Sequence, residues 1–368
     1  MISEMETIPT AAPEALSSAW GFTPGFVVCS QCGWGFLESS GVTTKRCPHC
    51  FKADLAPIEA SDQILYPELI LPFTLSKETL AAEVASFSQG IPYPPADLST
   101  ASLSARLQRI FIPTWLVDAG MRATWQCEAG FDYEVVSHQE RYSQGQGGWK
   151  TCEIKEPRVR WEPRLGRLER TYQNIAVPAL EEDARLKQRL GSYNLSGAQS
   201  YKPDLAQGAY FRLPDRSREG AWPEALPRFQ AAASEECRKA SAADHLRDFR
   251  WSPEFHDQNW TLLLLPLYAT YYLDDENQPH AVYIHGQSGK ASGERRASPR
   301  RARRAALMLL VAAGIVFLVS LLLAAAGLAL PLLLVLGGIG LIAAVLLALG
   351  AIIPVATAWQ FNRAQKST

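Results

Sequence analysis

The feature that most constrains this chain is a long uncharged stretch near its C-terminus. No Asp, Glu, Lys or Arg occurs between Arg304 and Arg363, and most positions there are Ala, Leu, Val, Ile or Gly. The first apolar run, residues 305–326, would rise about 33 Å as a helix and so match a hydrocarbon core of about 30 Å. A second run covers 332–356. Because neither run has the polar stripe of a soluble amphipathic helix, we predict two transmembrane helices.

Basic residues beside this stretch set its predicted orientation. Arg363 and Lys366 follow the second run. Six arginines precede the first run: Arg295, Arg296, Arg300, Arg301, Arg303 and Arg304. The positive-inside rule then places both ends of the chain in the cytoplasm, and the short uncharged connection at 327–331 predicts an antiparallel hairpin. The absence of ionisable residues from the two runs argues against an ion or proton pathway.

The basic linker 286–304 has two interpretations. It combines the six arginines and Lys290 with a single acid, Glu294, and with Gly, Ser and Pro, so we expect it to be loosely ordered. In one interpretation the arginines only orient the helices during insertion. In the other they also form a lipid-proximal basic cluster that binds anionic lipid, at about 1 kcal/mol per residue. The sequence leaves both open.

Four of the seven cysteines form two C-x-x-C pairs. Cys29 and Cys32 make the first pair, and Cys47 and Cys50 make the second. Each pair turns two thiolates towards one site, and four thiolates close a tetrahedral shell that leaves no position for water. We therefore predict one structural Zn²⁺ held in a zinc ribbon at 26–52. So short a ribbon has too small an apolar core to fold without its metal.

Two further predictions for this ribbon, the position of its hairpin turn and the role of its surface, rest on weaker sequence patterns. We place the hairpin turn at 39–41, between β-forming residues at 34–37 and 42–44. A basic-aromatic face for nucleic acid would consist of Lys45, Arg46, Lys52, Trp34 and Phe36. The same residues suit a solvated ribbon that binds protein or only stabilises the fold, and this is the interpretation that we favour.

The remainder of the sequence predicts a multidomain α+β protein. Residues 1–25 lack the basic and apolar regions of a secretory signal and form a flexible tail in our interpretation. Residues 53–68 are a linker, and 69–285 form a soluble α+β domain built on antiparallel hairpins. Residues 357–368 form a cytoplasmic tail after the second transmembrane helix.

Hydrophobic periodicity distinguishes helices from strands within the soluble domain. Helices are predicted at 76–88, where Ser76 is the N-cap, and at 99–108, 179–190 and 223–246. The predicted strands are 69–73, 110–118, 123–127, 133–136, 159–163, 175–178, 260–272 and 280–285. A loop is expected at 145–148.

The soluble domain shows no recognisable catalytic motif. Residues 286–291 lack the spacing and the final hydroxyl of a Walker loop, and no G-x-S-x-G elbow occurs. His280 and His285 lie five residues apart on one strand and should face opposite sides, so we expect no shared metal site and interpret both as surface or loop residues. Three further cysteines are expected to be buried small hydrophobes: Cys127, Cys152 and Cys237. These patterns predict a protein that is not an enzyme.

Several motifs resemble those of a known family. Residues 282–290 read VYIHGQSGK and precede a basic linker and apolar helices. The usual form of the family loop is NGQTGK, from which His285 and Ser288 depart conservatively. Four more stretches resemble family signatures: FIPTWLVD at 111–118, VRWEPRLG at 159–166, NIAVPA at 174–179 and LGSYNL at 190–195. Together with the ribbon they resemble the bacterial membrane proteins described as TFIIB-type zinc ribbon-containing, some of which carry primosomal-helicase names.

This resemblance implies a multi-pass protein of the bacterial inner (cytoplasmic) membrane with both termini cytoplasmic. It also implies a protein partner among SPFH-type or phage-shock-type membrane-stress proteins. With the lipid bilayer as a second partner, we expect a non-enzymatic, membrane-anchored adaptor that recruits a protein to the cytoplasmic face. The alternative is a membrane-tethered nucleic-acid-binding protein, although the net charge of −1 gives no global attraction for nucleic acid.

Overall fold

The structure is a computed structural model that describes residues 13–42, 44–58, 66–143, 148–326 and 331–366. Parts of six predicted segments lie outside these residues: 1–12, 43, 59–65, 145–147, 327–330 and 367–368. The fold is mixed α+β, as predicted, and ends in long apolar helices. Tertiary contacts divide the chain into two units. Unit 1 comprises Met1–Pro113, Glu182–Leu213 and Leu264–Thr368, and unit 2 comprises Thr114–Glu181 and Pro214–Leu263.

Unit 1 is built on a mixed sheet with the strand order β11-β10-β9-β5-β8-β2-β1-β3. The strands are β1 (Gly25–Cys29), β2 (Gly35–Glu38), β3 (Leu55–Pro57), β5 (Gln108–Ser143), β8 (Ala209–Arg212), β9 (His245–Leu273), β10 (Pro279–His285) and β11 (Ala291–Gly293). β5 and β8 run parallel. The short strands β4 (Leu69–Ile70) and β7 (Gln199–Ser200) pair with each other, and β4 also pairs with β9 of the sheet. Long strands β5 and β9 continue into unit 2.

Two helices of unit 1 begin at serine N-caps. The side chain of Ser76 accepts from the backbone N–H of Thr79 at the start of α2 (Lys77–Ser88), as predicted. Ser99 caps α3 (Thr100–Ala105) in the same way. The other short helices are α1 (Pro13–Trp20), α4 (Asp183–Leu190), α5 (Pro203–Ala206) and the 3-10 turn η1 (Leu195–Gly197).

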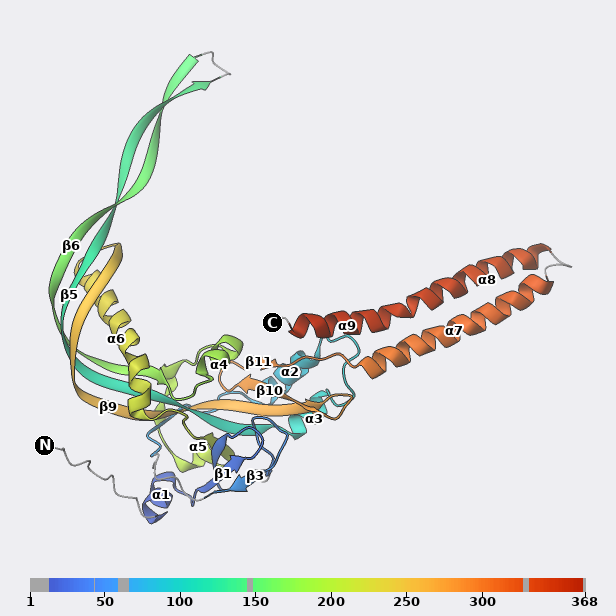
Figure 1. Ribbon diagram of the computed structural model, residues 1–368, viewed down its shortest axis with the longest axis horizontal. Coiled ribbons are helices and arrows are strands. Elements are labelled where there is room, and N and C mark those ends of the chain that lie inside the picture. Colours follow the sequence, from blue (N-terminus) through green and yellow to red (C-terminus); the bar gives the residue numbers. More distant parts are fainter. Residues whose placement is uncertain (1–12, 43, 59–65, 144–147, 327–330, 367–368) are drawn as a thin grey trace. The chain divides into compact units, whose positions relative to one another are not determined.

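Two C-terminal helices are long and apolar enough to cross a membrane, by length and composition. The first is α7 (Pro299–Ala326). The second candidate span, Leu332–Gln365, consists of α8 (Pro331–Gly350) and α9 (Ile352–Lys366). Figure 1 shows α7 and α8 lying side by side. Most of their large apolar side chains are exposed, Leu322 at 71 % among them, which is the reverse of a soluble protein's core helix.

The expected loose linker at 286–304 is instead ordered, so that prediction is wrong. Strand β11 lies within this linker and pairs with β10, which precedes it. Helix α7 already begins at Pro299. Ala302 of α7 and Ala358 of α9 belong to the same buried cluster as Tyr272 and Val282 of the sheet. The linker is ordered because distant parts of the chain supply apolar contacts and hydrogen bonds that its own composition does not reveal.

The expected flexible tail is also corrected where the structure describes it. Residues 13–20 form α1, and Trp20 is only 1 % exposed. Its ring packs edge-on against Tyr201 and Phe211, with centroids 5.5 and 4.8 Å away. The hydroxyl of Tyr201 donates to the Trp20 carbonyl at 3.0 Å. The large buried aromatic surface of Trp20 therefore fixes this end of the tail to the sheet.

Unit 2 contains a long antiparallel pair, β5 with β6 (Gly148–Pro178), which is paired from Thr114↔Pro178 to Ser143↔Gly148. Helix α6 (Arg218–Ala240) covers its base, where Ala233 packs on Met121 and Ala123. Figure 1 shows the two strands continuing past the ends of α6 and β9 as a two-stranded arm. The strands predicted separately at 110–118, 123–127 and 133–136 are thus parts of one strand, β5.

Candidate metal centre

The first C-x-x-C pair sits in a tight turn between β1 and β2. The backbone N–H of Gly33 donates to the Cys29 carbonyl at 2.9 Å, and the N–H of Cys29 donates to the Trp34 carbonyl at 2.9 Å. Gly33 has φ +73°, the left-handed conformation that favours glycine. The turn therefore reverses the chain and leaves Cys29 and Cys32 on one side of it.

The second pair repeats this turn with a different residue at its end. The N–H of Cys47 donates to the Ala53 carbonyl at 2.9 Å, and the N–H of Phe51 donates to the Cys47 carbonyl at 3.1 Å. Phe51 occupies the position that Gly33 has in the first turn, and its φ is +55°. Its ring is fully buried and stacks on Tyr271 at 4.7 Å, so packing holds a conformation that a non-glycine residue rarely adopts.

The two turns bring four sulfur atoms together. The Sγ atoms of Cys29 and Cys50 are 3.6 Å apart, and those of Cys32 and Cys47 are 3.7 Å apart. All four lie within 4.8 Å of one another. Disulfide sulfurs would be about 2.05 Å apart, and these cysteines are free. Corners of a tetrahedron with metal–sulfur bonds of about 2.3 Å lie about 3.8 Å apart, so the spacing fits a four-thiolate metal site.

The surroundings of the sulfur atoms favour a bound cation. Burial raises the pKa of Cys32 to about 11 and raises the pKa of Cys47 further. Burial also acts on Cys29, but backbone N–H groups of Cys32 and Gln31 hold the pKa of this thiol below its usual value. Because thiols must ionise to bind metal and buried thiolates need a compensating charge, this donor set suits a soft divalent metal.

An aromatic stack packs beside the second pair. His49 lies flat on Trp34, with ring centroids 3.6 Å apart and planes inclined by 7°. The guanidinium of Arg212 lies 4.3 Å from the Trp34 ring. From β10, the half-buried Tyr283 donates its hydroxyl hydrogen to the His49 carbonyl at 2.9 Å. Within the described chain the candidate ligand set contains only the four cysteines, so His49 supports the turn rather than joining the shell.

The predicted hairpin of the ribbon is wrong in its partners. β2 pairs with β1 across the first cysteine turn, from Gly25↔Glu38 to Val28↔Gly35. On its other side β2 pairs with β8, and β3 pairs with the free edge of β1. No strand is found in the described part of 42–44. A strand from far along the sequence thus takes the place that we had given to a local neighbour.

The residues of the alternative basic-aromatic face differ in how far their side chains are exposed. Phe36 is fully buried, Trp34 has His49 and Arg212 against it, and Arg46 donates to the Tyr271 hydroxyl at 2.8 Å. Bases stack on exposed aromatic rings. Buried Phe36 therefore offers no ring for a base to stack on, whereas the basic residues Lys45, Arg46 and Lys52 are exposed.

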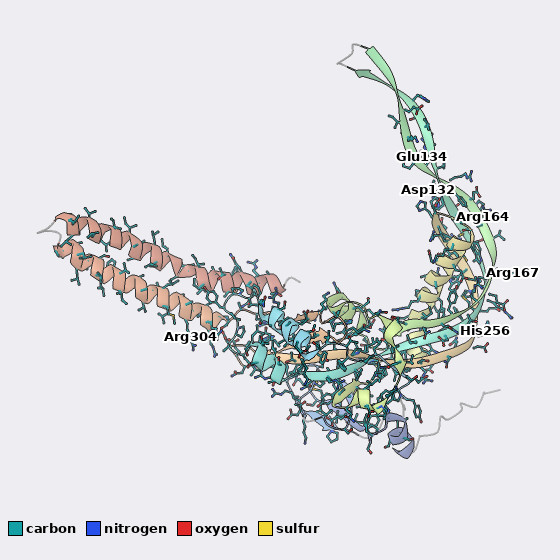
Figure 2. All side chains as sticks on the ribbon, turned by 180° about the vertical axis from the view of Figure 1, so that it is seen from behind. Asp132, Glu134, Arg164, Arg167, His256 and Arg304 are labelled. Carbon is teal, nitrogen blue, oxygen red and sulfur yellow. The ribbon has the colours of Figure 1, made fainter. Side chains whose placement is uncertain are left out.

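The six arginines beside the apolar helices do not form one cluster. Arg295 donates to the Gln89 carbonyl, and Arg296 pairs with Glu294. Arg300, Arg301 and Arg304 line a cavity of about 390 Å³, whereas Arg303 is not among its lining residues. Figure 2 shows Arg304 at the base of the helical hairpin. The structure thus gives these arginines different surroundings, and Arg301 both lines the cavity and donates to the Pro94 carbonyl.

The two histidines expected at the surface or in loops are buried residues of strand β10, so this prediction is wrong. His280 is 7 % exposed, and its ring nitrogens lie 2.9 Å from Asp274 Oδ2 and from Glu294 Oε2. His285 is 1 % exposed, and its Nδ1 accepts from the backbone N–H groups of residues 287 and 288. They bond to different groups, and each closes a turn next to β10. The two acids that bond to His280, Asp274 and Glu294, lie on either side of it in the sequence. They were the one sequence feature that could have indicated a buried, paired histidine.

Two of the three remaining cysteines are buried, as predicted. Cys127 is 5 % and Cys237 is 2 % exposed, and burial raises the pKa of both thiols. The side chain of Cys152 lies outside the described residues. High thiol pKa values and apolar surroundings make such cysteines unreactive.

Comparison of the chain with protein-family models, with curated proteins and with solved structures found no match. What the chain does must therefore be argued from its own residues.

Proposed function

We propose that this protein is a non-enzymatic, membrane-anchored adaptor with a zinc ribbon. It would hold a soluble body at the cytoplasmic face of a bacterial inner membrane and recruit a protein partner there. The four cysteines would bind one Zn²⁺, which supplies no open coordination position and so acts only in folding. Both termini are cytoplasmic in this proposal because arginines precede α7 and Arg363 follows the second span.

The observation that carries the proposal is a single buried core shared by the candidate membrane helices and the sheet. Ala302 and Ala358 from the helices pack with Tyr272 and Val282 from the sheet. Asn362 adds two hydrogen bonds to the backbone of Ala297, at 2.8 and 3.0 Å. A simple tether needs no such core. A core of this kind suits a protein whose task depends on holding a folded body at the membrane surface.

The two-stranded arm of unit 2 is the proposed docking element for the partner. Beyond Asp132, whose carboxylate bonds to His245 at the start of β9, the described residues of β5 and β6 pair with each other (Figures 1 and 2). Tyr133 and Val136 on this arm are each 47 % exposed. Extended strands with exposed edges and apolar side chains are suited to binding another chain.

Co-purification tests the adaptor. A tagged full-length chain should retain a specific protein after its membranes are solubilised, and SPFH-type and phage-shock-type proteins are the classes that the sequence resemblance names. The variant would delete residues 133–158, which include Tyr133 and Val136, and join the paired Asp132 and Val159 through an Asn-Gly turn. It should lose the partner but keep its metal and its membrane location. Absence of any stoichiometric partner from the full chain would reject the adaptor, and retention by the shortened chain would reject the arm.

The nucleic-acid alternative is tested on the same protein. Phosphate contacts make nucleic-acid binding fall steeply as salt rises. We expect the solubilised full chain to leave DNA and RNA unshifted at physiological salt. A salt-sensitive shift that Arg46→Gln or Lys52→Gln weakens would favour the alternative over the adaptor.

A further inference from the structure

A cavity of about 390 Å³ lies beside the first turns of α7. Three arginines contribute to its lining, Arg300, Arg301 and Arg304. Three acids also line it, Asp97, Asp274 and Asp275. The cavity therefore offers both positive and negative charge directly before the uncharged run that begins at residue 305.

The guanidinium groups of this cavity have no ionic partner within the described chain. Arg301 donates to the Pro94 carbonyl at 2.9 Å, and no ion pair is formed there by Arg300 or Arg304. These last two stand one helical turn apart, so their side chains project from the same face. Two adjacent guanidinium groups are well suited to binding the oxygens of a phosphodiester.

The backbone N–H groups of Arg300 and Arg301, at the start of α7, already have hydrogen-bond acceptors. The N–H of Arg300 donates to Asp275 at 2.8 Å, and the N–H of Arg301 donates to the Ser298 hydroxyl at 3.0 Å. The Ser298 hydroxyl in turn donates to Asp275. The arginine side chains, and not the helix N-terminus, are therefore the groups left to bind an anion.

The acids differ in how far their charge is balanced. Arg106 binds both carboxylate oxygens of Asp97, and His280 bonds to Asp274. Asp275 accepts hydrogen bonds only from Ser298 and from the backbone of Arg300, and no cationic side chain pairs with it in the described residues. Its carboxylate therefore remains able to bind a cation.

The level of the cavity along α7 matches that of lipid headgroups. Arg304 is the last charged residue before the apolar run of the helix, and in a spanning helix such a boundary lies at the edge of the hydrocarbon core. Phospholipid phosphates occupy this level. An apolar acyl chain leaving the cavity would lie along the exposed apolar side chains of α7.

From these contacts we infer that the cavity binds the headgroup of an aminophospholipid such as phosphatidylethanolamine. The phosphodiester lies against the guanidinium groups of Arg300 and Arg304, and the ammonium group lies against the carboxylate of Asp275. Phosphatidylglycerol carries the same phosphodiester and would also satisfy the arginines, but its neutral glycerol would leave the carboxylate of Asp275 without a cationic partner. This inference rests on the membrane anchorage in the proposed function and adds a defined lipid to it.

Lipid titration of the purified full chain in detergent tests this site. Phosphatidylethanolamine should bind at least tenfold more tightly than phosphatidylglycerol. The double variant Arg300→Gln/Arg304→Gln should weaken its binding at least tenfold. Arg303→Gln is the matched control, because its side chain leaves the same helix about 100° away and does not line the cavity; it should bind as the unmodified protein does. Asp275→Asn should remove the preference for phosphatidylethanolamine.

Three outcomes would overturn the inference. They are equal or tighter binding of phosphatidylglycerol, an equal loss in Arg303→Gln and in the double variant, and competition by inorganic phosphate at the concentration of the lipid. Circular dichroism and metal content should match in all variants. Membrane fractionation separates the two proposals. If the unmodified chain is absent from membranes, the anchorage fails; if the double variant fractionates with membranes and still binds the lipid, only the headgroup site fails.

Discussion

Residues 33 and 51 show how one backbone requirement is met in two ways. Each follows the second cysteine of its pair and has positive φ, +73° at Gly33 and +55° at Phe51. Glycine adopts this conformation without steric conflict. Phe51 holds it while its ring is fully buried against Tyr271, so the packing free energy of the ring exceeds the conformational strain.

Two substitutions at Phe51 separate these effects. Phe51→Ala should lower the free energy of unfolding by about 3–5 kcal/mol, the usual loss for a buried phenylalanine. Phe51→Gly should be less destabilising by about 1 kcal/mol, because it loses the same ring but relieves the left-handed strain. Thermal unfolding of both zinc-loaded variants measures the difference. A Phe51→Gly variant less stable than Phe51→Ala would show that strain at this position is negligible.

Replacement of a single cysteine tests the metal. We expect elemental analysis to give one zinc per chain for the unmodified protein and close to none for Cys47→Ser. The sulfur of Cys47 is buried in the four-sulfur cluster, and a serine hydroxyl is a poor replacement for a thiolate ligand. Cys237→Ser, which alters a buried cysteine outside the cluster, should keep its zinc. Zinc retained in full by Cys47→Ser would rule out the site.

At the scale of elements, small residues let α7 and α8 approach closely. A Cβ added to Gly337 would lie 2.7 Å from the backbone nitrogen of Ala324, and one added to Gly340 would lie 2.1 Å from the Ser320 hydroxyl. Gly338, between them in sequence, has nothing within 4 Å of the same position. The glycines are therefore not equivalent, and two of the three form the helix–helix contact typical of membrane proteins.

The two adjacent glycines provide a matched pair of variants. Gly337→Val forces a side chain into backbone and should destabilise the hairpin by about 1–3 kcal/mol, as overpacking usually does. Gly338→Val enters open space and should leave hairpin stability nearly unchanged. Unfolding of the full chain in mixed detergent micelles measures both. Equal effects of the two substitutions would contradict the observed helix packing.

At the scale of the whole molecule, the segment before α7 is held by a group of acids around the β9–β10 turn. His280 bonds to Asp274 and Glu294, and Ser298 bonds to Asp275. Although burial raises the pKa of Asp274, hydrogen bonds from His280 and from two backbone N–H groups hold it below its usual value. For Glu294, bonds from Arg296 and His280 likewise outweigh burial and lower the pKa.

These lowered pKa values predict acid sensitivity. A carboxyl group whose folded-state pKa is below its unfolded value of about 4 stabilises the fold above that pH and loses this contribution as pH falls through the folded-state pKa. Melting temperature should thus fall as pH is lowered from about 5 towards 3. Asp274→Asn should be less stable at pH 7 and should show a smaller change on acidification. Glu276→Gln, at an exposed acid of the same turn, should behave as the unmodified protein; an Asp274→Asn profile parallel to it would refute the assignment.

The sequence alone determined the features that depend on short spacing or long composition. Two C-x-x-C pairs bring two sulfurs together within each turn, an uncharged run of membrane length shows in composition, and Ser76 caps the helix that directly follows it. Such features need no distant partner. The sequence therefore predicted the four cysteines of the candidate site and the two apolar helices.

Tertiary structure decided every feature whose partner lies far along the chain. β2 pairs with β8, not with residues 42–44; Trp20 is buried by Tyr201 and Phe211; and the linker before α7 is ordered by the β9–β10 turn. The burial of His280 and the separation of Arg300 and Arg304 from Arg303 also depend on such contacts. Local composition carries no record of them, because their free energy comes from surfaces that meet only when the chain folds.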